Sequence, residues 1–350
     1  MRRLFYGWLI LSFFVSLIGC TPKPTISPTL TLTPVPVDTL DESSVELVTL
    51  LGQVTEPRAE ISGMAWCRDH LILLPQYPGQ YRTDATGFVF SIPRDQISDY
   101  LNISSESGIK PDMIPFDQGG LDQSVAGFEG FESIAFFEEH FFVSIESRQG
   151  GGMMGYLVKG VVQGDCEALA VDPDSIIEVA PQADLDNMSD ETLMIYQDQL
   201  FSIYEANGEN VNPDPIAHVF DLGLDYIEVR PLPNIEYRIT DATDVDEDGK
   251  FWAINYFFPG DGKKLKPAID QIAMEFGLGD SHMGAEGVER IIAMQITDGG
   301  IILIDETPIY IELSGESRNW EGIVRFENGF LIVTDKFPTT LLAFVEDIDN

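Results

Sequence analysis

The sequence predicts an all-β fold, a five-bladed β-propeller whose ring is closed by an N-terminal strand. Two observations predict it: one hairpin phrase occurs five times, and the last copy is followed by too few strands to complete a blade. Hairpins repeated at intervals of roughly 60 residues are typical of propellers, in which every blade is a small antiparallel sheet. The five copies are SGMAWCRDHLILLPQ from Ser62, ESIAFFEEHFFVSIE from Glu132, ETLMIYQDQLFSIYE from Glu191, TDVDEDGKFWAINY from Thr243 and EGIVRFENGFLIVTD from Glu321.

Each copy is predicted to form the two inner strands of one blade. A dense apolar run is followed by a polar turn, such as Glu327-Asn328-Gly329, and then by a run of β-branched and aromatic residues. The fourth copy is one residue shorter in its turn. Apolar stretches between the copies, for example MMGYLVKGVV and PIAHVFDL, supply outer strands, and SIPRDQISDYL and KPAIDQIAMEFGL are predicted as short helices in outer loops.

The last predicted blade lacks one strand. After the fifth copy only TTLLAFVED remains, which is enough for one outer strand. We expect VELVTLLGQV, which begins after Ser44, to complete this blade and close the ring, because an unpaired blade edge would be open to aggregation. A six-bladed ring is the alternative if GAEGVERIIAM is a degenerate sixth copy.

The N-terminal segment lies outside the predicted propeller, which spans residues 42–350. Two arginines precede an apolar run that ends in LIGC, and this pattern is typical of secretory signals. The apolar run is too short for a membrane span. Residues 1–19 resemble the signal peptide of bacterial lipoproteins, which implies a lipid on Cys20 and an extracytoplasmic protein anchored to a bacterial membrane. A plain signal peptide with an incidental cysteine is the alternative. Residues 20–41 are rich in Thr and Pro and are predicted to be an extended tether.

The composition narrows the range of partners. With 58 acidic and 20 basic residues the chain is strongly anionic, which disfavours nucleic acid and anionic lipid headgroups and favours cations. We therefore expect membrane contact through the lipid, and a small molecule or a surface protein as the ligand. Cys67 and Cys166 are the two cysteines that remain in the predicted exported body. They form either a disulfide or two buried free thiols, and the sequence leaves both alternatives open.

The residues that open the five copies are the candidate metal ligands. The innermost strands of a propeller line its central channel, so their equivalent positions converge there. Three carboxylates held together repel one another unless a cation binds between them, and Ca²⁺ accepts carboxylate and hydroxyl oxygens. We expect a central calcium ion. The alternative is that the acids are solvated or paired with arginine. In the fourth copy, Asp241 or Asp244 could take the place of Thr243 as the ligand. The predicted ligands are Ser62, Glu132, Glu191, Thr243 and Glu321.

Two resemblances bear on function. The phrases FESIA and WEGIV, each opening a hairpin that ends in an acid, resemble the esterase-like and phytase-like secreted propellers. The order Ser, Glu, Glu, Thr, Glu resembles the calcium-activated apyrase family, five-bladed propellers that hydrolyse nucleoside di- and triphosphates. This resemblance implies a calcium role for Ser62, Glu132, Glu191 and Glu321, with Thr243 in place of a serine. The sequence departs from that family in having few basic residues near the hairpin ends to offset phosphate charge.

Three functions stay open. The first is an exported, lipid-anchored propeller with a central divalent cation that presents a loop face to a ligand or partner. The second is a calcium-dependent hydrolase of phosphate esters or phosphoanhydrides, and the third is an interaction module with an empty channel. A hydrolase needs a basic rim, for which the candidates are Arg82, Arg148, Arg318 and Lys336. A binding protein would present an aromatic patch, for which the candidates are Trp252, Tyr256, Phe257 and Phe258. Among the histidines, His282 in a Gly-rich loop is the catalytic candidate.

Overall fold

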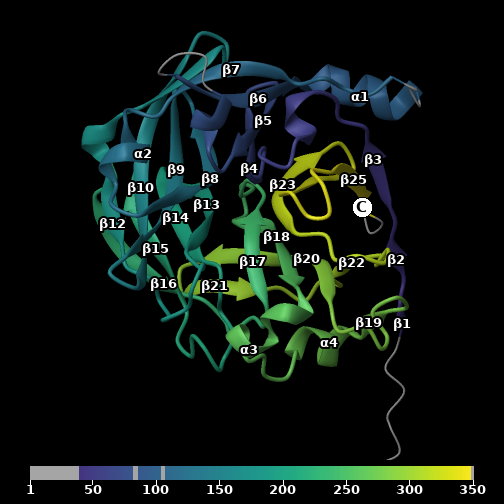
Figure 1. Ribbon diagram of the computed structural model, residues 1–350. Coiled ribbons are helices and arrows are strands. Elements are labelled where there is room, and N and C mark those ends of the chain that lie inside the picture. The colour runs from purple at the N-terminus through teal and green to yellow at the C-terminus, as the bar shows by residue number, and fades with distance from the viewer. Residues whose placement is uncertain (1–38, 82–85, 104–106, 348–350) are drawn as a thin grey trace, which may run out of the picture. The chain divides into compact units, whose positions relative to one another are not determined.

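A computed structural model describes residues 39–81, 86–103 and 107–347 of the chain (Figure 1). The predicted signal peptide, the lipid site at Cys20, most of the tether and Arg82 lie outside the described residues. No helix in the described part of the chain combines the length and the apolar character that a bilayer crossing requires.

Five antiparallel blades of four strands each form the described body, which confirms the five-bladed prediction. Blade 1 consists of β4 (Ile61–Cys67), β5 (His70–Pro75), β6 (Gly87–Pro93) and β7 (Asp112–Asp117). Blade 2 consists of β8 (Phe128–Phe137), β9 (His140–Gln149), β10 (Gly152–Gln163) and β11 (Ala168–Val171), and β12 (Ile177–Val179) also pairs with β10. Blade 3 consists of β13 (Asp190–Tyr196), β14 (Gln199–Tyr204), β15 (Ile216–Asp221) and β16 (Tyr226–Pro231).

The last two blades complete the ring. Blade 4 consists of β17 (Arg238–Ala242), β18 (Lys250–Phe257), β20 (Val288–Thr297) and β22 (Ile309–Ile311), and β21 (Gly300–Leu303) also pairs with β20. Blade 5 consists of β23 (Trp320–Phe326), β24 (Gly329–Thr334), β25 (Leu342–Glu346) and β3 (Val45–Val48). The innermost strands β4, β8, β13, β17 and β23 neighbour one another around a closed circle (Figure 1). The stretch GAEGVERIIAM leads into β20, a middle strand of blade 4, so the six-bladed alternative is wrong.

The N-terminal strand closes the ring as predicted. β3 pairs antiparallel with β25, from Val45 opposite Val345 to Val48 opposite Leu342. Two short strands before it attach the preceding chain to blade 4, because β2 (Glu42–Ser43) pairs with β22 and β1 (Thr39–Leu40) pairs with β19 (Leu278–Gly279). β3 thereby covers the outer edge of β25, and β2 covers the outer edge of β22.

Deleting Val45–Val48 should destabilise the protein far more than deleting four residues from the Thr/Pro-rich tether. The first deletion removes the backbone partners of β25 and exposes the edge of blade 5, whereas the second shortens the predicted linker. Thermal unfolding of the two deletion variants measures the difference. Equal melting temperatures would contradict the closing role of β3.

The structure also tests the two predicted helices and the pairing of the two cysteines. Both predicted helices form, as α1 (Arg94–Ile103) and α4 (Gln271–Phe276), and two single turns, α2 (Leu121–Ser124) and α3 (Gly262–Leu265), lie in other loops. Asp270 caps α4 by accepting the N–H groups of Ile272 and Ala273. Cys67 and Cys166 are joined by a disulfide, which ties the first hairpin of blade 1 to the turn between β10 and β11 of blade 2.

Candidate functional site

The inner strands share a β-bulge that brings four of the predicted ligands to equivalent positions. In β4, β8, β13 and β23 the register shifts by one residue near the start of the strand. A bulge of this kind redirects a side chain out of the regular alternation of the strand. The bulged residues are Ser62, Glu132, Glu191 and Glu321, and all four line one cavity.

The fourth blade departs from the prediction, because the structure does not bring Thr243 to this position. Thr240 occupies the bulge of β17, and Thr243 lies beyond the end of that strand. The Thr243 hydroxyl donates to the carbonyl of Asp244 (3.0 Å) and accepts the N–H of Trp252 (3.1 Å). Asp241 is also in the bulge, but its carboxylate accepts a backbone N–H of blade 5 (2.9 Å). The connection after β17 spans residues 243–249, whereas the other inner hairpins have two-residue turns, so the strand ends earlier than an alignment on the turn predicts.

The two bulged hydroxyl residues hold neighbouring blades together. Ser62 Oγ donates to the carbonyl of Phe131 (2.6 Å), and Thr240 Oγ1 donates to the carbonyl of Trp320 (2.6 Å). Each acceptor is the residue just before the bulged glutamate of the adjacent blade. Both donor hydrogens are therefore used inside the protein.

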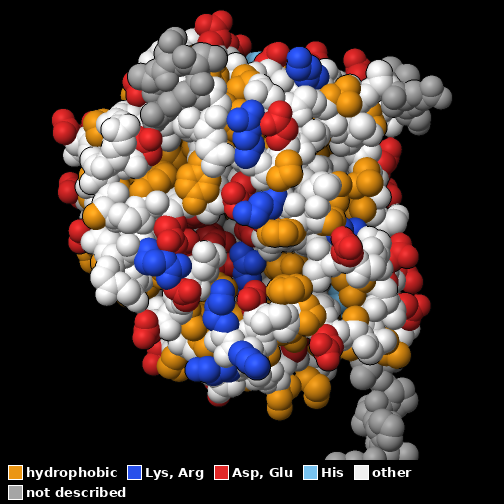
Figure 2. All heavy atoms as spheres, in the orientation of Figure 1, with side chains coloured by type: hydrophobic (Ala, Val, Ile, Leu, Met, Phe, Trp, Pro, Cys, Tyr) orange, Lys and Arg blue, Asp and Glu red, His pale blue; other side chains and the backbone are white. Residues whose placement is uncertain are grey.

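The cavity at the bulges, here called the axial cavity, has a volume of about 600 Å³. Figure 2 shows a hollow near the centre of this face, with acidic side chains inside it and basic and hydrophobic side chains beside it. Its lining consists of Glu60, Ile61, Ser62, Gln76, Tyr77, Phe128, Glu129, Glu132, Glu146, Arg148, Asn187, Glu191, Arg238, Asn319, Glu321, Asp335, Lys336 and Phe337.

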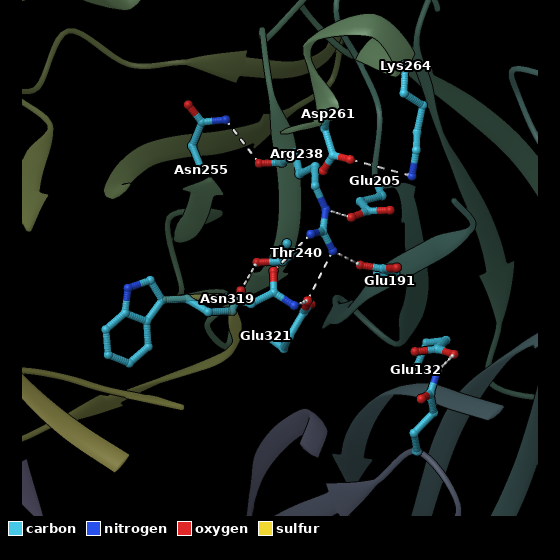
Figure 3. A network of polar contacts seen from close by, with 12 residues as sticks. Glu132, Glu191, Glu205, Arg238, Thr240, Asn255, Asp261, Lys264, Asn319 and Glu321 are labelled. Atoms are coloured by element: carbon cyan, nitrogen blue, oxygen red, sulfur yellow. Dashed lines mark hydrogen bonds and ion pairs between the residues drawn. The ribbon is translucent and has the colours of Figure 1, made fainter. Parts of the chain in front are cut away.

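Arg238, the first residue of β17, is a largely buried cation in the wall of the axial cavity, with its side chain 11 % exposed. Its guanidinium lies between three carboxylates (Figure 3): it pairs with Glu205, with Glu321 at 3.0 Å and with Glu191 at 3.6 Å. It also donates to Asn319 Oδ1 at 2.9 Å. For Glu191 and Glu321, Arg238 supplies the charge compensation that the sequence pattern predicts from calcium.

The negative charges of the cavity carboxyls are only partly compensated. Glu132 Oε1 accepts a hydrogen bond from Gln76 Nε2 (2.9 Å). Glu146 on β9 is 2 % exposed, and its Oε1 has no hydrogen-bond partner. Glu191 is 7 % exposed, and its Oε2 has no hydrogen-bond partner beyond the ion-pair contact with Arg238. Among the carboxyls that line the cavity, two buried oxygens thus lack a hydrogen bond, which is costly in a protein interior.

Sequence reasoning missed both Arg238 and Glu146. A signal for Glu146 was present, since four of the repeated phrases end in an acidic or amide residue. One of these final residues contacts a leading residue directly, because Gln76 binds Glu132, and Glu205 binds Arg238, which in turn pairs with Glu191 and Glu321. The four final residues are Gln76, Glu146, Glu205 and Asp335. No comparable pattern marks Arg238.

Burial and mutual repulsion raise the pKa values of the cavity carboxyls. Burial, followed by the charge of Glu191, raises the pKa of Glu146 to about 8. Burial raises the pKa of Glu191 to about 7, although Arg238 works against the rise. Burial and the charge of Glu146 hold the pKa of Glu132 well above its ordinary range, and burial does the same for Glu321 against the effect of Arg238. Near neutral pH the cavity therefore holds both protonated and ionised carboxyls.

The predicted calcium site fits these residues in part. The orphaned oxygens of Glu146 and Glu191 are suitable calcium ligands, but Glu321 is bound by Arg238 and Asn319, and Thr243 lies elsewhere. Among the residues that the structure describes, no three His, Cys, Asp or Glu side chains are placed so that they could hold a metal ion together. The calcium ion stays a prediction.

The predicted basic rim is largely neutralised. Arg148 and Lys336 line the axial cavity, but Arg148 pairs with Glu129 (2.8 Å) and Lys336 pairs with Glu60. Arg318 is away from the rim; it is buried and pairs with Glu289. The fourth candidate, Arg82, lies outside the described residues.

Of the predicted aromatic patch, Trp252, Tyr256 and Phe257 are buried and Phe258 is exposed. His282 is buried too, at the attachment of the N-terminal chain to blade 4. Its Nδ1 lies 2.7 Å from Glu42 Oε1, and its Nε2 accepts a backbone N–H (3.2 Å). With both ring nitrogens engaged, His282 has a structural role.

No protein-family model matches the chain, and no curated protein matches it. Among solved structures, the chain is similar to a glycosyl hydrolase from Bacteroides ovatus, with 9 % identity, a TM-score of 0.43, and coverage of 85 % of this chain and 86 % of that one. It is also similar to a protein of the GH130 family of mannoside phosphorylases and glycoside hydrolases, with 8 % identity, a TM-score of 0.44, and coverage of 89 % and 86 %. A third is an exo-1,5-α-L-arabinanase from a bovine ruminal metagenomic library, with 7 % identity, a TM-score of 0.41, and coverage of 87 % and 95 %. Likeness at this level says nothing of the chemistry or ligand of this chain.

Proposed function

We propose that the protein is an exported, lipid-anchored binding protein whose axial cavity takes up a cation. One observation carries this proposal: Glu146 and Glu191 line the cavity, and each has a buried oxygen without a hydrogen-bond donor, although Glu191 keeps its ion-pair contact with Arg238. A buried carboxylate without a partner is unstable as an anion, so it binds either a proton or another positive charge. The raised pKa values describe carboxyls that hold protons when no cation is bound. A bound cation would replace those protons.

The charge balance of the axial cavity supports the same proposal. Each of its basic side chains already has an acidic partner. The surplus carboxyls attract cations and repel anions. Calcium is the occupant that the sequence predicted, and we propose Glu132, Glu146 and Glu191 as its ligands after a rearrangement of their side chains, since in this structure they are not placed to hold a metal ion together. The lining includes seven carboxyl residues, Glu60, Glu129, Glu132, Glu146, Glu191, Glu321 and Asp335, against three basic ones, Arg148, Arg238 and Lys336.

The location is part of the proposal. Anchoring through lipid on Cys20 and an extracytoplasmic position rest on the N-terminal sequence. The disulfide between Cys67 and Cys166 supports an oxidising compartment, where such bonds persist.

Calcium should bind more tightly at about pH 8 than at about pH 6, with release of protons, because the cavity carboxyls must ionise to bind it. Without a cation, the free energy of unfolding should fall as pH rises from about 4.5 to about 8, since Glu146 holds its proton in the folded state across this window. Calorimetry measures the binding and its proton release. Calcium at about a hundredfold its dissociation constant should raise the stability by about 2.7 kcal/mol.

The matched pair of variants for this test is Glu146→Gln and Glu178→Gln. Both residues belong to blade 2, but Glu178 is exposed on β12 away from the axial cavity. Glu146→Gln should weaken calcium binding at least about tenfold and flatten the pH dependence of stability, whereas Glu178→Gln should change neither. Calcium binding that is insensitive to both pH and Glu146→Gln would refute the assignment of the cavity.

A hydrolase is the second candidate, favoured by the pKa values of about 8 for Glu146 and about 7 for Glu191. Neighbouring carboxyls in different protonation states can act as general acid and general base. The surplus of acid favours an uncharged or cationic substrate, because a phosphate would find the basic side chains already paired. We expect any turnover to appear with 4-nitrophenyl glycosides or esters rather than phosphates, and to be lost in Glu146→Gln. Turnover of phosphates alone would contradict this assignment.

A further inference from the structure

A second hollow adjoins the axial cavity and differs from it in character. It has a volume of about 530 Å³. Two of its aromatic side chains are exposed, Phe258 by 48 % and Phe337 by 57 %. The residues that define this apolar hollow are Tyr256, Phe258, Phe337 and Pro338, with Asp261, Glu316 and Ser317 also in its lining.

The two hollows share a wall. Arg238, Asn319 and Phe337 line both of them. The guanidinium of Arg238 is neutralised by its carboxylate partners and lies 5.6 Å from the centre of the Tyr256 ring. Phe337 is exposed where the two hollows meet, so a molecule that extends from one to the other would pass over its ring.

Exposed aromatic side chains beside a buried acidic cavity are complementary to one kind of molecule. Apolar surface left in contact with water is stabilised by covering it with another apolar group. The carboxyl oxygens that lack a hydrogen bond accept one most strongly from a donor that carries positive charge. An aromatic ring beside such a site also attracts a cation directly.

We infer that the axial cavity and the apolar hollow form one site for an organic ammonium ion that carries an apolar body. The ammonium group binds among Glu132, Glu146 and Glu191, and the body covers Phe337 and Phe258. This inference rests on the proposed cation binding and names the class of cation. A bare metal ion would use the axial cavity alone and leave the two aromatic rings exposed.

The test compares three probes by calorimetry on the purified protein in detergent. Phenethylammonium has both the charge and the apolar body, ethylammonium has the charge with a minimal body, and 3-phenylpropionate has the body with the opposite charge. Phenethylammonium should bind at least about tenfold more tightly than ethylammonium. The carboxylate probe should not bind.

Variants separate the two halves of the site. Phe258→Ala should weaken phenethylammonium binding toward the affinity of ethylammonium, with Phe337 retaining part of the difference, and should leave ethylammonium binding unchanged, whereas Glu146→Gln should weaken the binding of both ions. The control is Tyr226→Ala, which removes an aromatic side chain that is 61 % exposed on β16, outside both hollows. This control should change neither affinity.

Each outcome decides between the two proposals. Equal affinities for the two ammonium ions, with no effect of Phe258→Ala, overturn the joint site and leave cation binding intact. Binding of calcium without either ammonium ion has the same consequence. Binding of 3-phenylpropionate overturns the requirement for positive charge, and the absence of binding by every cation overturns both proposals.

Discussion

Replacing Arg238 by Met should lower the free energy of unfolding by about 3–5 kcal/mol, the loss expected when one partner of a buried ion pair is removed. Glu205, one of its partners, is fully buried and has a second oxygen that already lacks a hydrogen-bond partner. Glu191 and Glu321 would lose their contact with the guanidinium as well. Methionine fills similar volume, so the effect reports charge rather than a void.

Chemical denaturation at about pH 8 and about pH 5.5 measures this loss and tests its cause. The loss should be smaller at the lower pH, because the stranded carboxyls can take up protons there. Adding Glu205→Gln to Arg238→Met should recover part of the stability. Arg58→Met is the matched control, since Arg58 pairs with Glu56 at the surface and such pairs contribute roughly 0–1 kcal/mol. A loss in Arg238→Met no greater than that of the control would refute the central role of the arginine.

Removing the disulfide between Cys67 and Cys166 should cost roughly 2–5 kcal/mol of unfolding free energy. The bond joins residues 99 positions apart, so its loss frees a long loop of the unfolded chain. It also ties two blades whose outer strands β7 and β11 pair across their boundary, from Leu169 opposite Phe116. Blades 1 and 2 should therefore separate more readily in the variant.

The double variant Cys67→Ala, Cys166→Ala measures this contribution by denaturation, and reduction of the parent protein provides an independent comparison. Reductant should lower the stability of the parent and leave the double variant unchanged. A stability loss below about 1 kcal/mol in the double variant would show that packing at the blade boundary dominates over the covalent bond.

The ring itself could be predicted from the sequence because its determinants are local. Four of the five inner hairpins combine apolar runs with a polar two-residue turn, and these features lie within about fifteen residues of one another. The closing strand was predictable by counting, since blade 5 has its other three strands between Trp320 and Glu346 and lacks a fourth. The pairing of Cys67 with Cys166 was left open, because sequence carries no distance between two turns on different blades.

The candidate site was predictable where it follows the repeat and unpredictable elsewhere. Ser62, Glu132, Glu191 and Glu321 were found because each opens a copy of the hairpin, and Thr243 was misplaced because the turn of blade 4 is long. The balance of charge was decided by the tertiary structure. Arg238 meets Glu205 and Glu321 across separations of 33 and 83 residues. Periodicity reports which face of a strand is apolar, but the energy of a charge depends on its burial and on its distance to other charges, and those were determined by how the blades pack around the axis.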